Sequence, residues 1–188
     1  MINKKRLVKH FIELVKIDSE SGNESAVRDY LQQKLCNLGL DVALDKKGNL
    51  YAIHHGNPNG PSLLFSAHMD TVMPGNGVLP VVKGDKIFSK GNTILGGDDK
   101  SGIAEILELL HLIKEKQIDT PSIVVIFTVE EEMGLKGAKK IEPVQVDYGF
   151  VLDLGGKIGT VAIKAPTHYK FKAVVHGKTA HAGIEPEK

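Results

Sequence analysis

One histidine and one aspartate, two positions apart, follow an apolar run that predicts a buried strand over residues 62–67. A neutral imidazole can bind zinc through one ring nitrogen if an acceptor holds the other, and Asp70 could hold His68 in this way. The same pair also occurs by chance at the polar end of a strand. His68 and Asp70 therefore predict a metal site only if further ligands lie nearby.

Two adjacent aspartates, Asp98 and Asp99, stand between a glycine pair and the start of a predicted helix. Carboxylates in this place can simply cap the helix and interact favourably with its dipole. A phosphate loop is excluded, because the aspartates replace the glycine expected before Lys100 and would repel phosphate. The other interpretation is a carboxylate whose two oxygens bridge two cations.

Acidic residues follow two more predicted strands. Three glutamates, Glu130, Glu131 and Glu132, come shortly after the strand predicted at 122–128, and Asp153 comes directly after an apolar pair in the strand predicted at 150–152. Consecutive carboxylates repel one another, so a buried group of them needs a cation nearby. The alternatives are a solvated charge run at a helix start for the glutamates and a turn-forming aspartate for Asp153.

These four signals are weak individually but share one placement, near the ends of strands or at a helix start. In open α/β sheets, functional residues gather at the carboxyl edge of the sheet. One imidazole and several carboxylates, without thiolates, suit zinc, cobalt or manganese. Two such ions about 3.5–4 Å apart polarise a carbonyl and activate a water. The sequence therefore favours a hydrolytic centre in which these residues bind zinc, cobalt or manganese.

Helices and strands alternate along the chain and would position these residues. Apolar residues at helical spacing predict helices over 3–16, over 24–38 and from 101 onward, with a short helix after Gly134. The polar segment 18–25 is expected to supply turns and a helix cap. Strands are predicted at 41–44, 50–53, 62–67, 78–82, 86–88, 122–128, 150–152 and 169–175.

This order predicts an α/β fold: a three-layer catalytic domain whose mostly parallel sheet is flanked by helices. We expect the catalytic domain to cover residues 1–165. The alternating pattern after Pro166 indicates the beginning of an α+β lid or dimerisation domain over residues 166–188.

The composition argues against several classes of partner. Net charge is +1, which gives no overall field toward nucleic acid or anionic lipid. No membrane span and no export signal are found. Cys36, the single cysteine, is expected to be a buried structural thiol, and a cytoplasmic location is predicted. Lys46 and Lys47 are expected to be solvated turn charges.

The motifs together resemble peptidase T-like enzymes, of the two-zinc superfamily that includes glutamate carboxypeptidase, aminoacylase and acetylornithine deacetylase. Five ordered motifs, running through nearly all of the chain, carry the resemblance. They are His68-Met69-Asp70-Thr71, Gly96-Gly97-Asp98-Asp99-Lys100-Ser101-Gly102, Glu131-Glu132-Met133-Gly134, Asp153, and Gly177 to Lys188 as the signature of the lid domain.

The resemblance implies roles for individual residues. The implied metal ligands are His68, Asp98, Glu132 and Asp153. Asp98 would bridge the two ions, and the peptide bond between Asp98 and Asp99 would be cis. Asp70 would orient His68, and Glu131 would be the general base. Gly134 sets the register of the glutamates and leaves Glu130 outside the site.

For the lid, His181 is similar to a histidine that reaches the substrate carbonyl oxygen, in some relatives across a dimer interface, and its other interpretation is a polar loop residue. The lid domain is where the full-length protein could form a homodimer. These enzymes have a further metal-binding histidine near the C-terminus of a chain about twice this length. We expect that ligand to lie beyond Lys188, so the 188-residue chain is expected to be inactive. It should keep the His68–Asp98–Asp153 site and bind the other ion weakly.

The resemblance predicts an aminopeptidase that hydrolyses short peptides, with tripeptides as the expected substrates. A deacylase of N-acyl amino acids uses the same metals and base, so the motifs do not separate the two activities. A third alternative is an inactive binding or dimerisation module. The intact set of predicted ligands and base argues against this alternative.

Overall fold

The computed structural model describes residues 1–167, 169, 171–174, 176 and 177. One compact unit spans Met1–Gly155, and Gly156 begins a second unit. The helices are α1 (Lys4–Val15), α2 (Ser25–Leu38), α3 (Gly97–Lys116) and the 3-10 helix η1 (Ala138–Lys140). The strands are β1 (Asp41–Leu44), β2 (Leu50–His54), β3 (Leu63–His68), β4 (Pro80–Lys83), β5 (Lys86–Ser89), β6 (Ile123–Thr128) and β7 (Tyr148–Val151).

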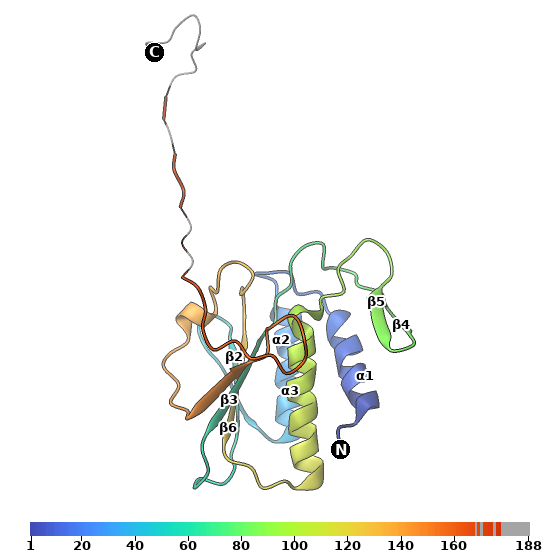
Figure 1. The fold of residues 1–188 in the computed structure, drawn as a ribbon, viewed down its shortest axis with the longest axis vertical. Helices are drawn as coiled ribbons and strands as arrows, with labels where there is room; N and C mark the ends of the chain where they lie inside the picture. The colour runs from blue at the N-terminus through green and yellow to red at the C-terminus, as the bar shows by residue number, and fades with distance from the viewer. Residues whose placement is uncertain (168, 170, 175, 178–188) are drawn as a thin grey trace, which may run out of the picture. The chain divides into compact units, whose positions relative to one another are not determined.

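Five strands form one sheet in the order β1-β2-β6-β3-β7 (Figure 1). β3 pairs in parallel with β6 and with β7, whereas the pairs β1–β2 and β2–β6 are antiparallel. β1 and β2 are antiparallel because only the short turn at 45–49 joins them. The predicted α/β class is confirmed. The sheet is mixed, and its parallel half consists of the strands that precede the predicted site residues.

Helices α2 and α3 pack on one face of this sheet, and α1 packs against α3 (Figure 1). Alternate residues of β6 point into the core between them, and Phe127 is fully buried there. The apolar stripe predicted on α3 is buried too, with Leu107 fully enclosed. Burying a side chain of this size stabilises the fold by about 1.5–3 kcal/mol. Apolar packing therefore sets how α3 lies against the sheet.

The opposite face of the sheet is covered differently. Leu64 and Ile126 face the segment 131–144, which contains η1. The short helix predicted after Gly134 is thus a single 3-10 turn. Within Met1–Gly155, this segment lies over that face of the sheet.

Several smaller predictions can be compared with the structure. The predicted hairpin at 78–88 is formed by β4 and β5, which make a separate two-stranded sheet. Cys36 is exposed, so its predicted burial is wrong: α2 turns Val27, Leu31 and Leu35 inward, and Cys36 lies one step beyond that face.

In the second unit, the described residues form no helix or strand. The strand predicted at 169–175 falls partly outside the described residues, and the described part of it is not paired. In the part of the chain described, no helix combines the length and apolar character that crossing a bilayer requires.

Candidate metal centre

His68 is the last residue of β3, at the carboxyl edge of the sheet, and is 2% exposed. Its Nδ1 lies 2.8 Å from the backbone oxygen of Asp70. A carbonyl oxygen only accepts hydrogen bonds, so Nδ1 carries the proton and Nε2 is the atom available to a metal. Nε2 lies 3.0 Å from Oδ1 of Asp98, which comes from the start of α3.

Asp153 completes a first group of possible ligands. Atoms of His68, Asp98 and Asp153 all lie within 4.8 Å of one another. Asp153 comes two residues after β7, and the parallel pairing of β3 with β7 brings it to the same edge as His68. The structure thus assembles the three residues predicted for one metal ion.

A second group consists of His68, Glu131 and Glu132, whose ligand atoms also lie within 4.8 Å of one another. Both glutamates follow β6, and their backbone is held by Asp70. Oδ1 of Asp70 accepts from the amide of Glu131 at 2.8 Å, and Oδ2 accepts from that of Glu132 at 3.1 Å. The predicted site residues of β3 and β6 therefore form one cluster.

Asp70 relates to His68 partly as predicted. Oδ1 of Asp70 lies 3.4 Å from Nδ1 of His68, farther than the backbone oxygen of the same residue. The main chain of Asp70 thus makes the closer contact with the ring, while its carboxylate holds the glutamates. Burial alone would raise the pKa of Asp70, but hydrogen bonds from His68, Ser21 and the two glutamate amides lower it.

Negative charge dominates this edge of the sheet. Burial lowers the pKa of His68, but the hydrogen bonds with Asp70 and Asp98 outweigh it and raise that pKa to about 10, so a cation that binds Nε2 would displace a proton from this nitrogen. Burial raises the pKa values of Glu131, Glu132 and Asp153. Repulsion from neighbouring carboxylates raises these pKa values further, whereas attraction to His68 lowers them.

A divalent cation would relieve this repulsion. The donor set is one imidazole and several carboxylates without a thiolate, which fits zinc, cobalt or manganese. The residues of this edge therefore suit the metals that the sequence predicted.

Glu130 points away from the cluster. Its carboxylate pairs with Lys47 and lies 3.3 Å from Nζ of Lys136. This agrees with the expected register of the glutamates. Lys47, expected to be a solvated turn charge, is therefore in an ion pair.

The start of α3 contains three residues whose roles the sequence did not reveal: Asp99, Lys100 and Gly102. Asp99 is buried and accepts from the amides of His68 and Gly102, at 3.3 and 3.2 Å. Lys100 is buried as well, and its Nζ donates to the backbone oxygen of Ile17. Burial raises the pKa of Asp99 to about 8 and lowers that of Lys100 to about 8. The peptide bond between Asp98 and Asp99 is cis, as the resemblance implied.

Gly102 allows α3 to approach the end of β7. A Cβ at this position would lie 2.5 Å from Oδ1 of Asp99 and 2.7 Å from the backbone oxygen of Leu152. Only glycine fits so close a contact. The approach brings Asp98, on the helix, next to Asp153, which follows Leu152.

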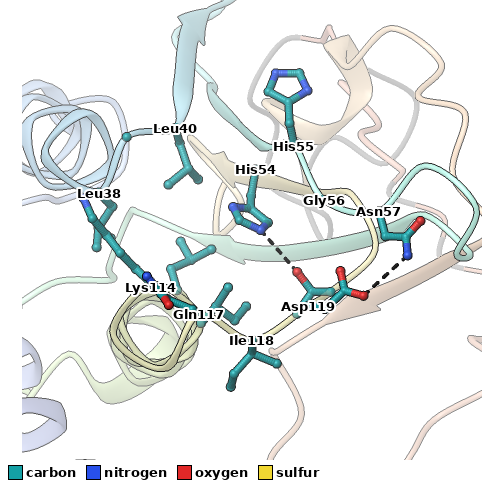
Figure 2. A pocket seen from close by; sticks show the side chains of 14 residues that line it. Leu38, Leu40, His54, His55, Gly56, Asn57, Lys114, Gln117, Ile118 and Asp119 are labelled. Carbon is teal, nitrogen blue, oxygen red and sulfur yellow. Dashed lines mark hydrogen bonds between the residues drawn. The ribbon is translucent and has the colours of Figure 1, made fainter.

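Two cavities differ in their relation to this centre. One, of about 420 Å³, adjoins it and is lined by His68, Glu131, Asp153 and apolar side chains of the second face of the sheet. Figure 2 shows the other, of about 540 Å³, with His54 and His55 in its lining. His54 pairs with Ile123 at the beginning of β6, so this second cavity lies at the opposite edge of the sheet from the metal centre. His181 lies outside the described residues.

The α/β fold and the imidazole–carboxylate cluster at the strand ends together define a site of the metallohydrolase class. The chain belongs to the M42 glutamyl aminopeptidase family, whose model matches residues 80–176. The predicted resemblance to peptidase T-like metallopeptidases is confirmed by the relatives described next.

Three similar proteins illustrate this relationship. YqjE of Bacillus subtilis, an uncharacterized protein, is 44% identical over 198 residues, which cover 100% of this chain and 53% of the relative. Peptidase T of Clostridium perfringens is 30% identical and is matched over 95% of this chain and 55% of its own. The crystal structure of a tripeptidase from Staphylococcus aureus superposes with a TM-score of 0.82 at 44% identity, covering 85% of this chain and 46% of that one. The chain thus spans about half the length of the curated relatives it matches.

Replacing Gly102 with alanine should separate α3 from the end of β7. We expect the free energy of unfolding, measured with urea, to fall by about 1–3 kcal/mol because the new methyl group meets backbone and carboxylate oxygens. Zinc affinity, measured by calorimetry, should fall as well because Asp98 moves relative to Asp153. Gly155→Ala is the matched control, since a Cβ there meets nothing within 4 Å. Equal stability and equal zinc affinity in the two variants would contradict this account of Gly102.

Proposed function

We propose that the whole protein is a metallopeptidase that removes residues from the N-terminus of short peptides, with tripeptides as the expected substrates. The convergence of His68, Asp98 and Asp153 with Glu131 and Glu132 at one sheet edge carries the proposal. The family and the peptidase T and tripeptidase relatives support peptide hydrolysis as the reaction class.

The proposed ligands divide into two sets. His68 and Asp153 would hold one divalent ion, Glu132 would hold the other, and Asp98 would contribute to both. Two zinc ions are proposed, and cobalt or manganese would suit the same donors. When bound, the ions would polarise the peptide carbonyl and supply an activated water.

Glu131 is the proposed general base. Its carboxylate belongs to the cluster, and its backbone amide is held by Asp70, so the side chain begins from a fixed position. It would take a proton from the attacking water and deliver that proton to the amine that leaves. Asp70 would support the reaction by keeping His68 in the tautomer that offers Nε2.

Three further parts of this proposal come from the sequence alone. They are contact of His181 with the substrate, a homodimer formed through the lid domain, and a cytoplasmic location. Each rests on the sequence and stays a prediction.

Zinc binding to this chain tests the metal centre directly. We expect His68→Ala to lower the zinc affinity at least about tenfold in calorimetry, because the only imidazole of both ligand groups is lost. His55→Ala is the control, since His55 is largely exposed at the opposite edge of the sheet. If the two variants bound zinc as tightly as the unaltered chain, the proposed centre would be wrong.

Glu131→Gln tests the base in the whole protein. We expect kcat to fall by about 10²–10⁴-fold, because an amide cannot accept the proton from water, while zinc remains bound. Glu130→Gln should keep most of the rate, since Glu130 pairs with Lys47 and Lys136 instead of facing the centre. If Glu130→Gln lost the rate and Glu131→Gln kept it, Glu131 would not be the base.

A comparison of substrates separates the peptidase from a deacylase. The whole protein should release amino acids from tripeptides at a higher kcat/KM than from N-acetyl amino acids, measured by free amine formed. Faster hydrolysis of the N-acetyl compounds would instead support the deacylase alternative.

A further inference from the structure

The loop of residues 17–24, which joins α1 to α2, contacts three of the segments that carry candidate ligands: the end of β3, the turn after β6 and the start of α3. None of its residues belongs to either ligand group. The sequence indicated only turns and a helix cap here. However, Glu24, the residue at the cap position of α2, makes no side-chain hydrogen bond to the helix. The side chains of Ser21 and Glu24 instead form hydrogen bonds with the segments that carry the candidate ligands.

The first contact is with the end of β3. The backbone oxygen of Ser19 accepts from the amide of Thr71 at 2.9 Å, and Oγ of Ser21 donates to Oδ2 of Asp70 at 2.6 Å. The Asp70 carboxylate is fully buried, so each of its donors matters to its orientation. Ser21 is the side-chain donor to the oxygen that also accepts from the amide of Glu132.

The second contact is with the turn that carries the glutamates. Oε1 of Glu24 accepts from the amide of Gly22 at 2.8 Å and from that of Glu130 at 3.0 Å. Glu130 has a φ of 49°, a left-handed conformation that is unfavourable for a residue with a side chain. The buried carboxylate of Glu24 therefore helps to hold this turn in its unfavourable conformation.

The third contact is with the start of α3. Nζ of Lys100 donates to the backbone oxygen of Ile17 at 2.7 Å, and Lys100 is 1% exposed. Lys100 follows Asp98 and Asp99 directly. One short loop thus joins the helix start, the end of β3 and the turn after β6.

We propose that the 17–24 loop positions the metal ligands, and that Ser21 and Glu24 are positioning residues of the centre. Ser21 fixes the Asp70 carboxylate, which in turn fixes the backbone of Glu131 and Glu132, and Glu24 fixes the residue before them. The loop therefore sets where the two glutamate side chains begin. This inference rests on the proposed function, because it assigns a purpose to the geometry of that centre.

Ser21→Ala in this chain is the test, with two measurements. In the metal-free chain, the amides of Glu131 and Glu132 should exchange with solvent about tenfold faster, because the Asp70 carboxylate that holds them is less restrained. Zinc affinity, measured by calorimetry, should fall about 10–100-fold, as for other residues that orient metal ligands. Ser21→Thr keeps the hydroxyl and should restore both values.

Ser25→Ala is the matched control, since Ser25 is exposed in the first turn of α2, four residues further along. If Ser21→Ala fails to fold, Glu24→Ala takes its place, with faster exchange expected at the amide of Glu130. Exchange and affinity both unchanged from the control would overturn the proposal. If the unaltered chain bound no zinc while Ser21→Ala still accelerated exchange, the proposed function would fail and the positioning role would stand.

Discussion

The parallel register of β3 with β6 and β7 is the constraint on which the rest of the structure depends. It sets His68 beside Thr128 and Ser66 beside Val151, so the residues that follow the three strands emerge at one edge. These strands lie far apart in the sequence, and parallel pairing requires long connections between them. The packing of α3 on the same strands then brings a fourth chain segment to that edge.

The cost of this convergence is electrostatic. Several carboxylates gather around one imidazole in a partly buried place, and the pKa values of Glu131, Glu132 and Asp153 rise because burial and mutual repulsion disfavour the charged forms. Backbone amides and the hydroxyl of Ser21 stabilise the charge of Asp70, and two backbone amides donate to Asp99, but no backbone amide of the described residues donates to the carboxylates of Glu131, Glu132 or Asp153. A site of this kind gains more from a cation than a fully hydrogen-bonded cluster would.

Local patterns explain which parts of this molecule could be predicted. Local patterns predict α3 because its buried residues repeat at helical spacing, and they predict β6 because it is a nearly continuous apolar run, as a strand buried on both faces requires. The antiparallel pairing of β2 with β6 was not predictable, since no short turn joins them. The candidate ligands were found by residue type, whereas Ser21 and Lys100 act across 49 and 83 positions through single hydrogen bonds. Such contacts leave no local pattern, and Cys36 shows that one step along a helix is enough to reverse burial.

The hydrogen bond from Nδ1 of His68 to its own strand end has a further consequence. It leaves the ring with a single nitrogen to offer, although His68 belongs to both ligand groups. An ion seated by Asp98 and Asp153 that takes this nitrogen leaves oxygen donors alone for an ion at Glu131 and Glu132. Within the described residues the two ligand groups are therefore unequal, because the one available imidazole nitrogen can serve only one of them.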